Sequence, residues 1–196
     1  MSRLVTQLPD IYEEKTYMRL TEARLLLALN LAALGVLAIA AAIFFGWLYF
    51  YHRALAGFAV LYDPARIDFT MILVMVLSMI VGHEWLHGLA IQYYGHPVRY
   101  GMKWTKLTPY ATSDSALFWR NQFIGVALAP LVGIAAMAWI VSWVTGPMLG
   151  AWIGMIAALN AAGSIGDIWM TRLALRFEAD VLIRDEEDGM RVFGRR

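Results

Sequence analysis

The feature that most constrains this fold is the apolar run of residues 25–51, which contains no charged side chain. A helix needs about 20 apolar residues to cross the hydrocarbon core of a bilayer, so this run is long enough. It closes on Trp47, Tyr49, Phe50 and Tyr51, an aromatic group typical of a membrane interface. A cleaved signal peptide is the alternative, but its apolar region has only about 7–15 residues. We therefore expect a transmembrane helix here.

Composition and further apolar runs extend this prediction to the whole chain. The residues are 60% hydrophobic and the mean hydropathy is +0.58, whereas soluble domains are about 45–50% apolar. We expect an all-α membrane protein with one multipass domain over residues 1–196. The predicted spans are residues 25–51, 69–91, 121–144 and 148–171, between a polar lead (1–24) and a charged tail (172–196).

The segments outside the spans differ in their content of Lys and Arg. The lead carries four, the segment 92–120 carries four and the tail carries six, whereas the loop 52–68 carries two. By the positive-inside rule, both termini and the segment 92–120 are expected in the cytoplasm, and the membrane is expected to be the plasma or inner membrane. Part of the lead is expected to form a short surface helix. The acidic run in the tail is expected to be a solvated surface.

The polar segment 92–120 shows the alternation of a small β-structure. Apolar and polar residues alternate over 98–104, and a second extended stretch follows over 107–112. This pattern predicts a β-hairpin within the cytoplasmic insert.

Residues 82–88 read Gly-His-Glu-Trp-Leu-His-Gly and follow an uncharged stretch of the second span. The pattern H-E-x-x-H predicts a metal site on a helix, because His83 and His87 share one face and can bind one ion. Glu84 lies beside the first ligand, where it can hold a water molecule and take its proton. Three ionisable side chains inside an apolar helix are costly, which favours a functional site over a chance match.

A catalytic zinc ion usually has three protein ligands and one open position, so a third ligand is needed. Asp167 is the candidate, because it is a carboxylate near the end of an otherwise uncharged span. It shares a helical stripe with Asn160, Gly163 and Ser164, at positions i, i+3, i+4 and i+7. Small residues on this stripe allow another helix to approach closely. We therefore predict Asp167 as the third ligand.

Other assignments stay open. Asp167 could instead be an interfacial carboxylate that pairs with Arg172. His96 follows the motif by nine residues and is another possible ligand. Glu178 and Asp180 in the tail are further candidates.

Asn160 is a candidate for positioning the substrate or an oxyanion. A hydrogen bond between helices is an equally good interpretation of the same residue.

Composition also excludes several classes of site. The chain contains no cysteine, so disulfides and thiolate zinc sites are excluded and zinc ligands must be His, Asp or Glu. The net charge is +1 and there is no basic tract, so nucleic acid is not expected as a partner.

These residues resemble the membrane zincin peptidases, and the nearest resemblance is to the zincin peptidase group once labelled a domain of unknown function, DUF3267. In that group an H-E-x-x-H-G helix is followed by a polar loop, an apolar helix with Ala-Pro, and a late Asn…Gly-Asp segment. The corresponding residues here are His83–Gly88, Pro109–Ala111, Ala129–Pro130 and Asn160–Asp167. The resemblance covers roughly residues 70–170 and implies a small multipass protein that binds zinc.

The chain is more distantly similar to the site-2 proteases, intramembrane metalloproteases with a later Asn-Pro…Asp-Gly segment. That similarity implies Asp167 as a zinc ligand and Asn160 as a residue that helps to place substrate. The sequence departs from the pattern, since no proline follows Asn160, and Gly166 precedes Asp167 instead of following it.

We expect a zinc metallopeptidase that cleaves peptide bonds near the cytoplasmic membrane boundary, with Glu84 as the catalytic base. Its partners would be the lipid bilayer and a protein or peptide substrate, with membrane proteins among the candidates. The predicted hairpin could bind an extended substrate by strand addition. The alternative is a non-catalytic zinc-binding membrane scaffold or regulator. A metal transporter is less consistent, because the first and third spans contain almost no polar residues.

Overall fold

The structure is a computed structural model that describes residues 4–19, 22–52, 69–104, 108–113, 116–186 and 189–196. The chain divides into two compact units. The first contains Met1–Leu29, Glu84–Ala129 and Gly166–Arg196, and the second contains Asn30–His83 and Pro130–Ile165. Each unit is described by itself below. The loop predicted over 52–68 lies almost entirely outside the described residues.

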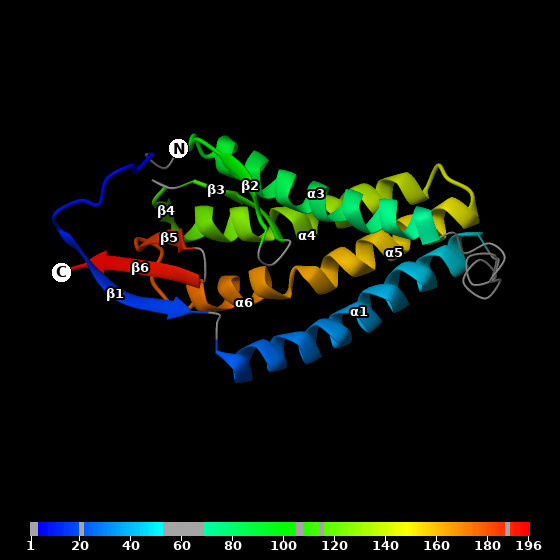
Figure 1. Cartoon of the computed structure of the whole chain (residues 1–196), viewed down its shortest axis with the longest axis horizontal. Helices are drawn as coiled ribbons and strands as arrows, with labels where there is room; N and C mark the ends of the chain where they lie inside the picture. The colour runs from blue at the N-terminus through cyan, green and yellow to red at the C-terminus, as the bar shows by residue number, and fades with distance from the viewer. Residues whose placement is uncertain (1–3, 20–21, 53–68, 105–107, 114–115, 187–188) are drawn as a thin grey trace. The chain divides into compact units, whose positions relative to one another are not determined.

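Three helices among the described residues are long and apolar enough to cross a membrane (Figure 1). They are α1 (Ala23–His52), α3 (Phe69–Tyr93) and α4 (Arg120–Ser142). They coincide closely with the first three predicted spans. A mostly helical architecture compatible with a membrane protein is therefore confirmed.

The fourth predicted span, 148–171, is broken instead of straight. It consists of α5 (Pro147–Gly163) and α6 (Ile165–Ala174), which are bent by 46° at the break. Ser164 stands between them, and its hydroxyl donates a hydrogen bond to the carbonyl of Asn160 at 2.9 Å. Such a bond competes with regular helix, and the adjacent Gly163 and Gly166 have low helix propensity. Asp167 consequently lies in the first turn of a separate short helix.

The first unit contains a four-stranded antiparallel sheet that the sequence did not reveal. Its order is β1-β6-β5-β4, formed by β1 (Tyr12–Arg19), β6 (Gly189–Arg195), β5 (Leu182–Glu186) and β4 (Phe118–Trp119). The predicted surface helix in the lead is therefore wrong, and the all-α class is incomplete. Both ends of the chain are strands because they pair with each other, as Tyr12 with Arg195 shows.

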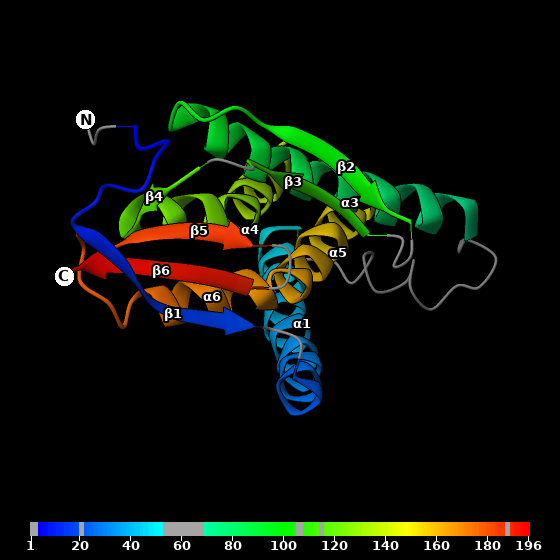
Figure 2. The ribbon, with the colours of Figure 1, turned by 60° about the vertical axis from the view of Figure 1, so that its left-hand side comes forward.

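Helices of the first unit pack against the sheet, and Figure 2 shows the strands with α6 alongside them. The core contains fully buried side chains of β5 and β6, such as Ile183 and Val192, both 0% exposed. The other members of this core are Ile91, Ala116, Phe118, Phe123, Val126, Leu173, Ala174, Val181 and Met190. The core thus joins the ends of α3 and α6 and the start of α4 to the sheet.

A separate two-stranded hairpin, also in the first unit, confirms the predicted one. It pairs β2 (Arg99–Lys103) with β3 (Thr108–Thr112), and Tyr100 lies opposite Ala111. The phenol of Tyr100 occupies the space that a Cβ would need at Gly88. Glycine in the H-E-x-x-H-G sequence therefore allows the hairpin to lie directly against α3.

The second unit is helical in its described residues. Phe44 of α1 packs with Ala138 of α4 and Ala157 of α5. The indole of Trp47 stacks on Trp139 with ring centroids 4.5 Å apart. These small and aromatic residues allow the helices to pack closely.

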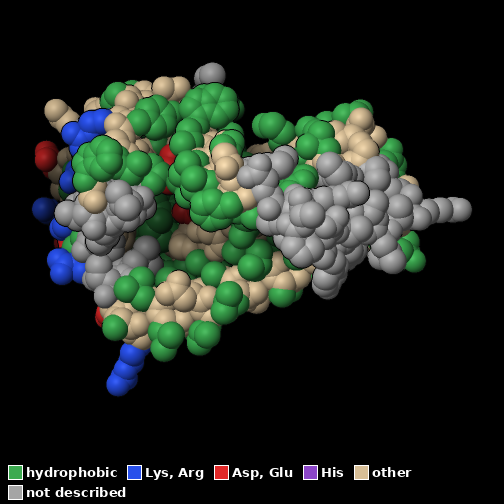
Figure 3. All heavy atoms as spheres, turned by 45° about the vertical axis from the view of Figure 1, so that its right-hand side comes forward, with side chains coloured by type: hydrophobic (Ala, Val, Ile, Leu, Met, Phe, Trp, Pro, Cys, Tyr) green, Lys and Arg blue, Asp and Glu red, His purple; other side chains and the backbone are tan. Residues whose placement is uncertain are grey.

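The outward faces of these helices are apolar. Figure 3 shows hydrophobic side chains at several places on the visible face, among other residues. Large exposed examples in the second unit are Leu34, Ile39, Val132 and Ile140, each more than 60% exposed. A surface of this kind is typical of contact with lipid.

Candidate metal centre

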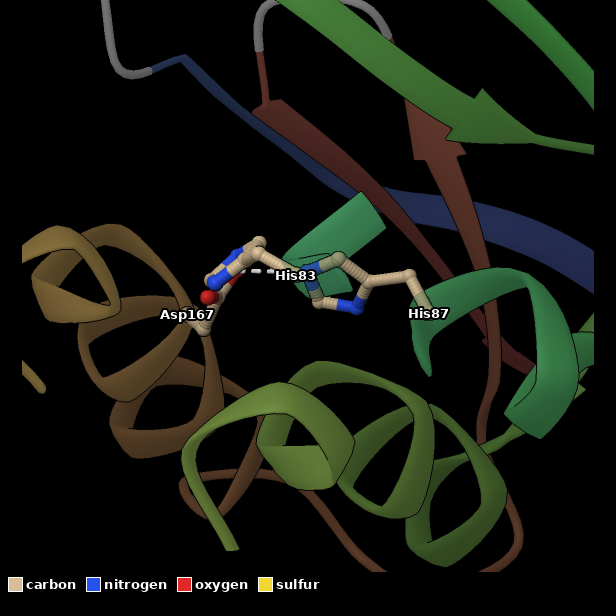
Figure 4. A group of neighbouring side chains, drawn as sticks. All are labelled: His83, His87 and Asp167. Carbon is tan, nitrogen blue, oxygen red and sulfur yellow. Dashed lines mark ion pairs between the residues drawn. The ribbon is translucent and has the colours of Figure 1, made fainter. Parts of the chain in front are cut away.

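The H-E-x-x-H motif lies on α3 as predicted, within one unbroken helix. One ligand atom from each of His83, His87 and Asp167 can be chosen so that all three lie within 4.8 Å of one another (Figure 4). Among the described residues, this is the one group of three or more His, Asp or Glu side chains with such spacing. The structure therefore brings together the three ligands that the sequence predicted.

The group is compatible in size and chemistry with zinc. Zinc binds imidazole nitrogen and carboxylate oxygen at about 2.0–2.1 Å, which in a tetrahedral site places ligand atoms roughly 3.3 Å apart. His87 Nε2 and Asp167 Oδ1 are 3.7 Å apart. Both side chains are half-buried, with exposed fractions of 14% and 15%. Two histidines and one carboxylate are the donor set of many catalytic zinc sites.

A backbone carbonyl of α4 orients the ring of His87. His87 Nδ1 lies 2.9 Å from the carbonyl oxygen of Val126. A carbonyl can only accept, so Nδ1–H is the donor and the lone pair of the neutral ring is on Nε2. That nitrogen is the one nearest Asp167.

Asn160 orients the ring of His83 in the same way, through a hydrogen bond to Nδ1. Asn160 Nδ2–H donates to the Pro130 carbonyl at 3.1 Å, and Asn160 Oδ1 lies 2.9 Å from His83 Nδ1. His83 therefore donates through Nδ1–H, and its lone pair is on Nε2. Asn160 is only 1% exposed. Its side chain forms a hydrogen bond between helices, which is one of the two roles considered for it from the sequence.

Glu84 lies beside His83 and is held by the hairpin. Its Oε2 accepts a hydrogen bond from the backbone N–H of Ala111 at 2.9 Å. In an antiparallel pair, every second residue directs its N–H and C=O groups toward the neighbouring strand. Pro109, two residues earlier in β3, has no N–H to donate to β2, so Tyr110 occupies the position that faces β2. The N–H of Ala111 consequently points away from β2, toward the outer edge of β3. The catalytic candidate is therefore fixed at this edge.

The rival ligands lie outside this group. His96 follows the end of α3, is 3% exposed, and its ring meets Phe118 edge-on at 4.7 Å. Burial lowers the pKa of His96 below its ordinary value. Asp180 pairs with Arg195 at 3.6 Å, and Glu178 is exposed.

Arg172 was the alternative partner for Asp167. Its guanidinium lies over the ring of Trp169, 5.8 Å from the centroid.

The comparison with known families agrees with this geometry. The family described as "Putative zincin peptidase" (DUF3267) matches residues 75–182, more than half of the chain. The chain belongs to this family. The match includes His83, Glu84, His87 and Asp167, so the whole candidate centre lies within the zincin peptidase region. No curated protein and no solved structure matches the chain.

Two backbone groups of this zincin peptidase site were not predicted from the sequence. These are the carbonyl of Val126 and the amide of Ala111, which hold His87 and Glu84. One signal for the first was available. Pro130 comes four residues after Val126, which is the spacing at which a proline removes the helical donor of a carbonyl.

Proposed function

We propose that this chain is a zinc-dependent peptidase that cleaves peptide bonds at the membrane boundary. The observation that carries the proposal is the ligand group of His83, His87 and Asp167 with Glu84 adjacent on α3. A site built only to hold zinc needs the two histidines and the carboxylate. Hydrolysis needs the glutamate as well.

The residues have distinct roles in this mechanism. His83 and His87 would hold zinc through Nε2, and Asp167 would hold it through a carboxylate oxygen. A zinc ion held here would supply Lewis-acid polarisation of the scissile carbonyl and would acidify the attacking water. Glu84 accepts the proton of the attacking water and transfers it to the departing amine. The Ala111 amide keeps the Glu84 carboxylate in place for both transfers.

The substrate is proposed to bind to the hairpin of β2 and β3 as an extended peptide. The Ala111 amide of this hairpin holds Glu84, so a peptide added to the hairpin would lie near the catalytic carboxylate. Strand addition uses main-chain hydrogen bonds and therefore suits peptides of varied sequence. It would also keep a transmembrane substrate unwound at the point of cleavage. Proline substitutions along 98–112 that leave cleavage intact would count against this mode.

The proposed cellular location rests on the distribution of Lys and Arg. The lead, the segment 92–120 and the tail carry four, four and six Lys and Arg residues. These numbers favour a cytoplasmic position for both termini and the hairpin in a plasma or inner membrane. The site near the end of α3 would then face the cytoplasmic boundary.

The first test is the metal content of the purified protein in detergent. About one zinc per chain is expected in the wild type, and loss of zinc is expected in His83→Ala and Asp167→Ala. The same preparations are then incubated with a peptide library and with unfolded membrane proteins, and the products are read by mass spectrometry. Zinc binding without cleavage of any substrate would favour the scaffold alternative. A wild type that binds no zinc on addition would overturn the proposal.

A further inference from the structure

The hydrogen bond that orients His87 depends on an interruption in α4. In an α-helix the carbonyl of residue i accepts from the N–H of residue i+4. The partner of Val126 would be residue 130, which is proline and has no N–H. The carbonyl of Val126 thus lacks its helical donor, and it accepts from His87 Nδ1 at 2.9 Å instead.

Pro130 also acts on His83, through its own carbonyl and the side chain of Asn160. The Pro130 carbonyl accepts from Asn160 Nδ2–H at 3.1 Å. Because a carbonyl cannot donate, the atom of Asn160 next to the Pro130 carbonyl must be the nitrogen Nδ2, and the other atom must be the oxygen Oδ1. The oxygen of Asn160 is thereby directed to His83 Nδ1, 2.9 Å away.

We propose that Pro130 is the positioning residue for both metal-binding histidines. The missing N–H leaves the Val126 carbonyl without its helical donor and turned to His87, and this effect is specific to proline. The Pro130 carbonyl, which any residue at this position would also have, orients Asn160 on His83. Both rings are held as the Nδ1–H form, which puts the lone pair on Nε2. This inference rests on the proposed zinc site and goes beyond it, since Pro130 touches neither zinc nor substrate.

Burial makes the arrangement effective. The Asn160 side chain is 1% exposed and Pro130 is fully buried, so water does not compete for these hydrogen bonds. Partners that orient metal-bound histidines typically change metal affinity by about 10–100-fold when they are removed. An alanine at position 130 would remove the clash of the proline ring with the Val126 carbonyl and bring back an N–H that draws this carbonyl toward the helix axis, away from His87.

The test compares zinc affinity in Pro130→Ala and Pro147→Ala, measured by chelator competition with the full chain in detergent. Pro147 is at the start of α5, where a missing N–H interrupts no helical hydrogen bond. We expect Pro130→Ala to weaken zinc binding about 10–100-fold and Pro147→Ala to leave it unchanged. Equal affinity in Pro130→Ala and the wild type overturns the role of Pro130 and leaves the proposed peptidase intact. A wild type that binds no zinc overturns the peptidase itself.

A second measurement decides the matter if Pro130→Ala does not fold. The ring nitrogens of His83 and His87 are observed by nitrogen-15 NMR in the metal-free wild type, at a pH where the rings are neutral. The Nδ1–H form is expected for both rings. The Nε2–H form at His87 would overturn the inference, because that ring could not donate to the Val126 carbonyl.

Discussion

The backbone N–H of Ala111 donates a hydrogen bond to Glu84 Oε2 at 2.9 Å and so ties the hairpin to the H-E-x-x-H helix. The bond fixes one oxygen of the Glu84 carboxylate at β3. The hairpin is therefore part of the candidate site and not a separate surface feature. Under the proposed mechanism, Glu84 is the residue whose substitution would separate catalysis from metal binding.

Glu84→Gln is expected to retain zinc and to lose cleavage. The amide keeps the size of the side chain but cannot take a proton, and general bases contribute about 10²–10⁴-fold to rate. Zinc content and cleavage are measured on one preparation. Glu178→Gln, an exposed change of the same kind, is the control and should behave as wild type. Equal cleavage in Glu84→Gln and wild type would show that Glu84 is not the general base.

Asp167→Asn is expected to weaken zinc binding strongly with little change in fold. The substitution removes the negative charge of a half-buried ligand while its shape is kept. Asp180→Asn is the matched control, because Asp180 pairs with Arg195 and lies outside the ligand group. Chelator competition gives both affinities. Unchanged zinc affinity in Asp167→Asn would show that the third ligand is another residue.

Asn160→Ala is expected to lower both stability and zinc affinity. It removes a buried amide that bonds to the part-buried His83 Nδ1 and to the buried Pro130 carbonyl. An unsatisfied buried polar group costs about 1–3 kcal/mol. Thermal unfolding in detergent and zinc competition check the two effects. Ser164→Ala, which removes a hydroxyl bonded to the Asn160 carbonyl, should leave zinc affinity near the wild-type value.

Gly88→Ala is expected to displace the hairpin and reduce cleavage while zinc is retained. The added Cβ would overlap the phenol of Tyr100, which must then move from α3. Because Tyr100 lies opposite Ala111, this movement would disturb the hydrogen bond to Glu84. The double variant with Tyr100→Ala should recover part of the lost rate, since the overlapping ring is absent. If the cleavage rate of the double variant did not recover, the overlap with Tyr100 would not be the cause of the loss.

Stability is expected to fall with acidification in part through His96. Burial holds its pKa in the folded state below the unfolded value of about 6.5. The unfolded chain therefore binds a proton more readily, and this part of the stability is complete above about pH 6.5 and is lost as pH falls toward the folded pKa. Tm measured between about pH 7 and pH 5 should fall more steeply in wild type than in His96→Leu. Identical slopes would show that His96 does not contribute.

The candidate site was more predictable from sequence than the sheet. The spacing of His83 and His87 places both on one helical face, and an ionisable Asp167 in an apolar segment is rare enough to be informative. The sheet was missed because β1 pairs with β6, almost the whole chain away, and neither strand has a strong local alternation. Backbone partners such as the Ala111 amide have no residue signature. They depend on how the hairpin packs on α3.

The pairing of β1 with β6 also limits how the chain can thread a bilayer. β1 precedes the first long helix and β6 follows the last, yet their backbones are hydrogen-bonded over Tyr12–Arg19 and Gly189–Arg195. Two strands of one sheet must be on the same side of a membrane. For a chain embedded in a bilayer, we therefore expect an even number of crossings. If α1, α3 and α4 each cross once, the bent segment of α5 and α6 must complete the return.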